Sequence, residues 1–423
     1  MSSLVIQGGK RLKGEVHIAG MKNAATPIIA ATLLTREPCV LQNVPKIADV
    51  QKMIAIIQSC GVEVRWTADH ELTIVAAEVD PTKINRDSIC ALRSSVLLAS
   101  PLLARAGVLD LPEPGGCIIG NRPLDTHLHV FETMGVAIGR NNGTYEFRGR
   151  PKAATIVLPE FSVTATENAI MAAVLAVGVT TIKLAAAEPH IQDLCAILIK
   201  MGAKINGVGT HTLSIEGVSE LHGVTHAIIP DQVEVGTFAV LAAATHSDIL
   251  LGPIVPEHID SIVTMLGAAG ARFKLQTLKS KGGMAELHII PSAHLQGFKV
   301  QAMPYPGFPT DLQAPAAVLA TQCKGTSLIH DPLFEGRMGY VHELIKMGAN
   351  AIVADPHRVI VSGPTPLYGQ EIKSLDLRAG ATLVIAGLIA EGETIIHDAE
   401  VIDRGYEDIE GRLQKIGATI KKI

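Results

Sequence analysis

Residue types that could do chemistry are concentrated in one glycine- and proline-rich stretch, residues 114–129 (PGGCIIGNRPLDTHLH). Proline fixes φ and glycine permits positive φ, so we expect an exposed loop here. Cys117 lies on this loop, where a thiol is better placed to react than to pack. Arg122 suits a phosphate or carboxylate, and a nearby cation lowers the pKa of a thiol. The stretch therefore predicts a reactive cysteine beside an anion-binding arginine.

A repeated unit of about 70 residues accounts for nearly the whole chain and must position this loop. Each copy reads as strand, helix, strand, helix and hairpin, which is a βαβαββ unit with parallel crossovers. Each is marked by a helix end that passes through a glycine into a strand, as expected for a helix C-terminus. The marker glycines are Gly61, Gly135, Gly202, Gly270, Gly348 and Gly417. We expect closed globular α/β domains; a solenoid is the alternative, but polar capping repeats are missing.

The sixth unit reaches Ile423 without its hairpin, and a matching hairpin, LVIQGGKRLKG, stands at residues 4–14. We therefore expect the N-terminus to close the last unit, which makes the C-terminal domain discontinuous. A chain of 423 residues also exceeds what one hydrophobic core usually serves, so two domains are expected.

Polar side chains gather at two positions of the repeat: the start of the first helix and the turn into the second. Equivalent loops of a repeated βα unit emerge on one side of a domain, where helix N-termini offer partial positive charge and free N–H groups. With several Lys and Arg added, these positions predict a polyanion site. The first set is Lys22, Asn23, Arg93, residues 164–168, Asp231, Asp311, Asp376 and Arg378, and the second is Lys46, Arg122, Glu188, Arg337 and Arg404.

Each of these residues also has a purely structural explanation. Asp231, Asp311 and Asp376 stand near helix starts and could be N-caps. Arg337 and Arg404 could be surface charges paired with acidic neighbours in the chain. The cations taken together indicate a binding site more strongly than any one of them alone.

Composition excludes several classes of function. The net charge is −5 and no basic run occurs, so nucleic acid is not an expected partner. The apolar runs fall far below the roughly 18 residues that span a bilayer, and no secretory signal is evident. Six scattered cysteines predict free thiols in a cytoplasmic protein, and all except Cys117 lie in apolar stretches typical of core residues. His127 and His129 fit no metal pair, so neither metal nor cofactor is expected.

Six long motifs lie in order along the chain: KNAATPI (22–28), PGGCIIGNRPLDTH (114–127), FPTDLQA (308–314), FEGRMGYVHEL (334–344), SLDLRAG (374–380) and DRGYEDIE (403–410). In these motifs the chain resembles the UDP-N-acetylglucosamine 1-carboxyvinyltransferases, a family of enolpyruvyl transferases. The resemblance implies an inside-out α/β barrel fold of two domains, each with three βαβαββ repeats, and a substrate cleft between them. It implies an N-terminal domain of residues 22–229, which carries the Cys117 loop, and a C-terminal domain of residues 1–21 plus 230–423.

The implied reaction moves the enolpyruvyl group of phosphoenolpyruvate to the 3′-hydroxyl of UDP-N-acetylglucosamine and releases phosphate, an early step of peptidoglycan precursor synthesis. It needs a proton for the methylene carbon, a base for the sugar hydroxyl, and cations for the phosphate and carboxylate. By motif match, Cys117 takes the role of the acid and Asp311 that of the base. The cations on phosphoenolpyruvate correspond to Lys22, Arg122 and Arg404, and the residue beside the reacting hydroxyl to Asn23.

The resemblance also implies the contacts of the nucleotide sugar. Glu160 and Thr164 depart from residues common in the family, and we expect these departures to affect nucleotide affinity more than turnover. We expect a monomer that acts on small molecules and is inactivated by the epoxide fosfomycin through Cys117. Uridine and diphosphate contacts carry over to Arg93, Arg122, Pro123, Leu124, Asp125, Thr126, Ser162, Val163, Thr164 and Leu333, with His127 on the same side and Arg337, Asp376 and Arg378 on the far wall.

Two other functions remain as alternatives. A 3-phosphoshikimate 1-carboxyvinyltransferase would share the fold and the cations, but it does not use a loop cysteine and lacks the PGGC run. A non-catalytic paralogue that binds a nucleotide sugar would not be expected to keep Cys117, Asp311 and the cations intact.

Overall fold

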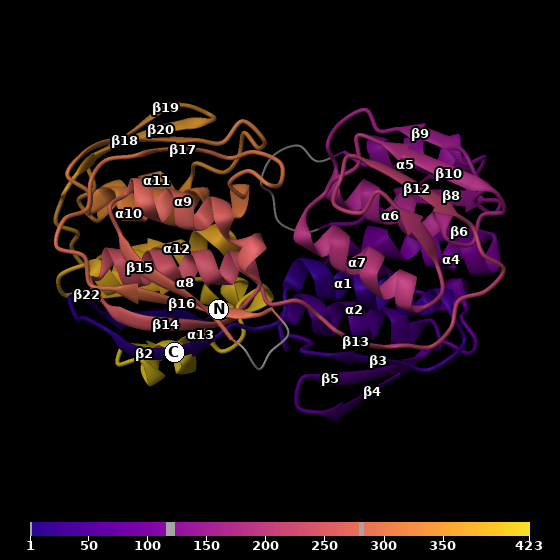
Figure 1. Ribbon diagram of the computed structural model, residues 1–423, viewed down its shortest axis with the longest axis horizontal. Coiled ribbons are helices and arrows are strands. Elements are labelled where there is room, and N and C mark those ends of the chain that lie inside the picture. Colours follow the sequence, from indigo (N-terminus) through magenta and orange to yellow (C-terminus); the bar gives the residue numbers. More distant parts are fainter. Residues whose placement is uncertain (1, 116–122, 279–282) are drawn as a thin grey trace. The chain divides into compact units, whose positions relative to one another are not determined.

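The computed structural model describes residues 2–115, 123–278 and 283–423, which form two compact units (Figure 1). The described residues of 20–229 make up the N-terminal unit, and those of 1–19 and 230–423 make up the C-terminal unit. Each unit has its own hydrophobic core. Cys117 and Arg122 lie outside the described residues. Within the described ranges, every helix is too short or too polar to span a bilayer.

The C-terminal unit is built around helices that are apolar on all sides. Every residue of α8 and α10 is buried, and so is nearly all of α12. A helix that is apolar all round must be surrounded by other elements. Gly236 of α8 allows close packing, because a Cβ there would overlap the side chain of Leu312. The helices of this unit are α8 (Gln232–Ala244), α9 (Asp260–Ala268), α10 (Gln313–Thr321), α11 (Tyr340–Lys346), α12 (Leu377–Ile389) and α13 (Ile409–Lys415), with short 3₁₀ helices η4 (Pro256–His258), η5 (Thr310–Leu312) and η6 (Ala399–Arg404).

Sheets surround these helices, as Figure 1 shows, which is the expected inside-out arrangement. The described strands of the C-terminal unit form sheets of order β15-β16-β14-β2, β17-β18-β20-β19 and β21-β22-β1-β23. In each sheet the opening strand runs parallel to the next strand of its repeat, and the remaining neighbours are antiparallel. The strands are β1 (Ser3–Gln7), β2 (Lys13–His17), β14 (Asp248–Ile254), β15 (Arg272–Thr277), β16 (Ala285–Ile290), β17 (Lys299–Gln301), β18 (Gly325–His330), β19 (Ala351–Asp355), β20 (Arg358–Gly363), β21 (Glu371–Lys373), β22 (Glu393–His397) and β23 (Thr419–Lys422).

The first strand of the chain completes the last sheet. β1 pairs antiparallel with both β22 and β23, with Ile6 opposite Thr394 on one side and Ile420 on the other. The expected hairpin over residues 4–14 does not form, because β2 pairs with β14 in a different sheet. The two N-terminal strands therefore serve different repeats.

The N-terminal unit repeats this plan with one exception. Its sheets have the orders β13-β3-β5-β4, β6-β8-β7 and β11-β12-β10-β9, so the described part of the second repeat lacks an opening strand. The side chains of Asp80 and Asn85 cap a 3₁₀ turn and a short helix there instead. The strands are β3 (Cys39–Gln42), β4 (Glu63–Ala68), β5 (Glu71–Val75), β6 (Val108–Pro112), β7 (Ala137–Asn141), β8 (Thr144–Arg148), β9 (Thr155–Val157), β10 (Val179–Lys183), β11 (Lys204–Asn206), β12 (Thr212–Glu216) and β13 (Thr225–Ala227).

In the N-terminal unit α6 is likewise buried apart from its first two residues, whereas α3 buries only Ile89 (Figure 1). The helices of this unit are α1 (Lys22–Ala31), α2 (Ala48–Ser59), α3 (Arg86–Cys90), α4 (Ala99–Ala106), α5 (Asp125–Thr133), α6 (Val163–Ala173) and α7 (Pro189–Lys200), with η1 (Thr32–Leu34), η2 (Pro81–Lys83) and η3 (Arg93–Leu98). In both units the six marker glycines adopt φ between 77° and 108°, which confirms their role at helix ends.

The cysteine prediction holds for four residues and is wrong for Cys90. Cys39, Cys60, Cys195 and Cys323 are buried, and burial raises the pKa of the first two to about 11 and of the last two to about 12. Cys90 is exposed, because the short helix α3 buries Ile89 and turns its last residue outward.

Candidate functional site

In the N-terminal unit, an ion pair holds Lys22, one of the residues that the sequence predicted to lie in the site. Lys22 begins α1, and its Nζ lies 2.7 Å from Oδ2 of Asp49 on α2. The Lys22 side chain is 16% exposed and that of Asp49 only 3%. Asn23 follows in the same turn and is half-buried. The lysine is therefore held at a helix start with part of its surface open to solvent.

A second group of predicted residues lies around the start of α5. Arg93 begins η3, and its Nη2 donates to the carbonyl oxygen of Pro123 at 3.2 Å. The Thr126 hydroxyl donates to Glu160 Oε1 at 2.9 Å, so Glu160 has a partner inside the predicted site. Of the remaining residues, Leu124 and His127 are buried, while Pro123 and Asp125 are exposed.

The start of α6 carries three further predicted residues. Ser162 is the N-cap, and its Oγ accepts from the Ala165 N–H at 3.4 Å. Val163 and Thr164 are the first two residues of α6. Their backbone N–H groups therefore have no acceptor within the helix. The Thr164 Oγ1 lies 3.0 Å from His127 Nε2, which joins α5 to α6. This helix start can bind an anion.

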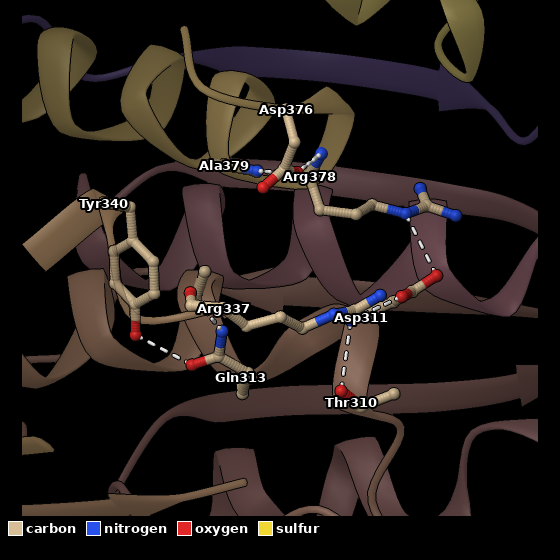
Figure 2. Close-up of a pocket in the computed structure, with 9 residues that line it drawn as sticks. Thr310, Asp311, Gln313, Arg337, Tyr340, Asp376, Arg378 and Ala379 are labelled. Atoms are coloured by element: carbon tan, nitrogen blue, oxygen red, sulfur yellow. Dashed lines mark hydrogen bonds and ion pairs between the residues drawn. The ribbon is translucent and has the colours of Figure 1, made fainter. Parts of the chain in front are cut away.

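In the C-terminal unit, a small pocket brings several predicted residues together (Figure 2). At its centre Asp311 receives two guanidinium groups, Arg337 Nη1 at 2.7 Å from Oδ1 and Arg378 Nε at 3.1 Å from Oδ2. The Arg337 guanidinium stacks over the Phe334 ring, which fixes its plane. Residues that line the pocket are Thr310, Asp311, Gln313, Ala314, Arg337, Tyr340, Asp376, Arg378 and Ala379.

The pocket leaves hydrogen-bonding capacity for an anion. Arg337 Nε and Arg378 Nη1 are buried, and neither has a hydrogen-bond partner among the described residues. Burial alone would lower the pKa of Arg378, but neighbouring Asp311, Tyr406 and Asp231 raise it above its ordinary value. The guanidinium group therefore stays charged, and a carboxylate or phosphate could satisfy its remaining donors.

The N-cap explanation is right for two of the three aspartates. Asp231 caps α8 and Asp376 caps α12, each accepting from two backbone N–H groups. Asp311 instead lies inside η5 and turns both oxygens to arginines. Burial raises the pKa of Asp231, and Arg378 opposes this shift.

Arg337 is enclosed, whereas Arg404 and Leu333 lie in more open places. Arg337 is only 11% exposed, so it is not the surface charge that the alternative explanation proposed. Arg404 ends η6 and is half-buried, and its neighbour Asp403 pairs with Lys422. Leu333 is 39% exposed, and its N–H donates to Asp331 Oδ1 at 3.0 Å.

Sequence reasoning missed several members of these clusters. Tyr340 donates to Gln313 Oε1 at 2.8 Å in the pocket, and both residues stand within motifs already noted, which was the available signal. Asp49 had no such signal, because its contact with Lys22 arises only when α1 packs on α2. Asn168 was among the polar residues noted at 164–168, but its contact with His127 was not predicted.

Comparison with known proteins adds independent information. The family model of EPSP synthase (3-phosphoshikimate 1-carboxyvinyltransferase) matches residues 6–413. The UDP-N-acetylglucosamine 1-carboxyvinyltransferase of Bradyrhizobium diazoefficiens is 42% identical over 430 residues, covering 99% of this chain and 97% of that protein. The UDP-N-acetylglucosamine 1-carboxyvinyltransferase 1 of Carboxydothermus hydrogenoformans is 43% identical and covers 100% and 99%.

Solved structures show the same fold at lower sequence identity. The enolpyruvyl transferase NikO from Streptomyces tendae superposes with a TM-score of 0.89 at 24% identity, covering 100% of this chain and 98% of that one. EPSP synthase from Acinetobacter baumannii gives a TM-score of 0.77 at 21% identity, with both chains covered in full. Full-length matches of this kind confirm the family and fold that the motifs indicated. The chain belongs to the EPSP synthase family of enolpyruvyl transferases, and within it to the UDP-N-acetylglucosamine 1-carboxyvinyltransferases.

Proposed function

We propose that the chain transfers the enolpyruvyl group of phosphoenolpyruvate to the 3′-hydroxyl of UDP-N-acetylglucosamine, with release of phosphate, in peptidoglycan precursor synthesis. The observation that carries this proposal is the end-to-end similarity to relatives that bear this name, at 42% and 43% identity. The second support is a pocket whose arginines keep unpartnered donors for an anion. Small anionic substrates fit both observations.

The chemistry requires an addition followed by an elimination. A proton adds to the methylene carbon of phosphoenolpyruvate while the sugar 3′-oxygen, losing its proton to a base, bonds to the adjacent carbon. The bond from that carbon to the phosphate oxygen then breaks, and loss of a proton from the new methyl group restores the double bond. Electrons and atoms balance without an oxidant or a metal ion. The enzyme must supply an acid, a base and cations.

We assign these roles to residues of this chain as follows. Cys117 delivers the proton to the methylene carbon, and Asp311 accepts the proton of the sugar hydroxyl. Both oxygens of Asp311 are held by Arg337 and Arg378 in the structure. An incoming anion that draws the guanidinium groups to itself frees Asp311 to act as a base. Lys22, Arg122 and Arg404 hold the phosphate and carboxylate of phosphoenolpyruvate, and Asn23 orients the hydroxyl.

We also propose that the nucleotide sugar contacts the starts of η3, α5 and α6. Arg93, Ser162, Val163 and Thr164 lie at these starts, where backbone N–H groups favour a diphosphate. The described cysteines are free thiols, as a reducing compartment favours, so the proposal further places the chain in the cytoplasm. We also propose that the chain is a monomer. Size-exclusion chromatography with light scattering tests the monomer.

Incubation of the purified protein with phosphoenolpyruvate and either UDP-N-acetylglucosamine or shikimate 3-phosphate tests the reaction. Phosphate release is expected when the acceptor is UDP-N-acetylglucosamine and not when it is shikimate 3-phosphate. Cys117→Ala should reduce turnover by about 10³-fold, since it removes the acid. Cys90→Ala is the matched control, because it removes an exposed thiol outside the proposed site. Phosphate release with shikimate 3-phosphate alone, or undiminished turnover of Cys117→Ala, would contradict the proposal.

A further inference from the structure

A buried chain of polar side chains leads from the interior of the N-terminal unit to the start of α6. It joins Ser100 on α4, Asn168 on α6, His127 on α5 and Thr164 on α6. Ser100 and Asn168 are fully buried, and His127 is 3% exposed. Buried polar groups of this kind are costly unless each finds a partner, so their hydrogen positions are strongly determined.

The Val96 carbonyl determines the orientation of the Asn168 amide. Asn168 Nδ2 lies 3.1 Å from the Val96 carbonyl oxygen. Because a carbonyl oxygen can only accept, the amide nitrogen must face it. The opposite side of the amide is compatible with this assignment, since the single hydrogen of the Ser100 hydroxyl faces two acceptors, the Asn168 carbonyl oxygen at 2.7 Å and Asn168 Oδ1 at 2.8 Å.

This orientation determines the tautomer of His127. The second hydrogen of Asn168 Nδ2 points to His127 Nδ1 at 2.9 Å, so Nδ1 must be the acceptor. The ring proton is therefore on Nε2, which donates to Thr164 Oγ1 at 3.0 Å. Thr164 thus accepts from the ring, and its own hydroxyl hydrogen remains to be donated. Among the described residues, no side chain or carbonyl takes that hydrogen.

We propose that Asn168 is a positioning residue for the nucleotide sugar: by holding His127 as the Nε2–H tautomer, it keeps the Thr164 hydroxyl as a hydrogen-bond donor to an anionic diphosphate oxygen. The Thr164 hydroxyl belongs to the first turn of α6, beside the N–H groups of Val163 and Thr164. In the other tautomer Nε2 would accept, and the hydroxyl hydrogen would be used inside the protein. The identity of the ligand rests on the proposed function, whereas the direction of each hydrogen bond from Asn168 to Thr164 does not.

Three variants test the coupling, with the dissociation constant of UDP-N-acetylglucosamine measured by titration calorimetry and kcat by phosphate release. Thr164→Val removes the hydroxyl and should weaken binding about tenfold with less than a twofold change in kcat, since a hydrogen bond to a charged group is lost. Thr164→Ser should recover most of the affinity. Thr212→Val, an exposed threonine of β12, is the matched control.

Asn168→Ala should weaken binding severalfold in the wild-type background and have no further effect in Thr164→Val, because both act through one hydroxyl. Additive effects would mean that Asn168 contributes only packing, and would overturn the inference. The ¹⁵N spectrum of the His127 ring provides a readout without ligand, assigned by comparison with His127→Gln. We expect Nε2 to be protonated and Nδ1 to be unprotonated. A protonated Nδ1 would overturn the inference, and this readout does not depend on whether Asn168→Ala folds.

The two proposals fail in different ways. A wild-type protein that binds the nucleotide sugar but releases no phosphate contradicts the proposed function only. A protein that forms product while Thr164→Val binds with unchanged affinity overturns the role of Asn168 only. Absence of binding overturns both.

Discussion

The two units bury glutamates on their central helices in opposite environments. Glu234 on α8 is 2% exposed, and its Oε1 accepts from Arg412 Nη2 and, at 3.0 Å, from the Ala19 N–H. Glu167 on α6 is equally buried, and both its burial and the neighbouring carboxylate of Glu188 raise its pKa well above the ordinary value. Glu234 has a guanidinium partner, whereas Glu167 favours the protonated form.

The same contrast extends to the candidate site residues. The C-terminal unit sets guanidinium groups against carboxylates, as in the cluster of Asp311 with Arg337 and Arg378. The N-terminal unit relies on neutral hydrogen bonds at the start of α6, although its Lys22–Asp49 pair is an exception. Since both units share one repeat, the fold determines where functional residues gather but not which charges they carry. The two units can therefore differ in the charges that their candidate site residues carry.

The largest effect is expected from breaking the charged cluster of the C-terminal unit. Asp311→Asn keeps the size of the side chain but removes the base and the negative charge between two arginines. We expect kcat to fall about 10³-fold, measured by phosphate release. Asp408→Asn is the control, because asparagine can still cap α13 as Asp408 does. A fall of less than tenfold for Asp311→Asn would show that another group accepts the proton.

A smaller effect is expected from removing the partner of Glu234. Arg412→Met leaves a buried carboxylate without its guanidinium, so the free energy of unfolding should fall by about 3 kcal/mol, measured by chemical denaturation. Arg358→Met removes an arginine that is 55% exposed and pairs with Asp355, and it should cost less than about 1 kcal/mol. Equal losses in the two variants would mean that burial of the pair is unimportant.

The smallest effect is a pH dependence confined to the N-terminal unit. Because the folded protein raises the pKa of Glu167, the stability that its protonated form contributes is present below the ordinary value of 4.5 and is lost as pH rises through the folded value. Glu167→Gln should therefore become progressively more stable than wild type as pH rises from 5 to 8. Thermal unfolding of both proteins across this range measures the difference, with exposed Glu220→Gln as the control. A difference that is constant or shrinks with pH would contradict the assignment.

Local chemistry made much of the fold predictable. The marker glycines indicated helix ends because left-handed backbone strongly favours glycine, and all six adopt positive φ. Helix starts were found through their polar residues, and Asp231 and Asp376 are indeed caps. The second repeat departs from the pattern for an equally local reason, since Asp80 and Asn85 start helical turns where a strand was expected.

Contacts between distant segments were not predictable in the same way. The expected hairpin at residues 4–14 failed because strand pairing depends on partners hundreds of residues away. Whether Asp311 is a cap or an ion-pair partner depended on Arg337 and Arg378, which come from other elements. The Asn168–His127 contact spans 41 residues and has no local signature. Motif similarity predicted site residues without giving their partners.

The pairing of β1 with β22 and β23 has a consequence for synthesis on the ribosome. Residues 3–7 are made before both of their neighbours, which lie beyond residue 392. The N-terminal unit can complete its sheets while the nascent chain is still growing, whereas the other unit must wait for its last strands. Chaperones that shield exposed strand edges therefore have a defined target in the N-terminal segment throughout translation.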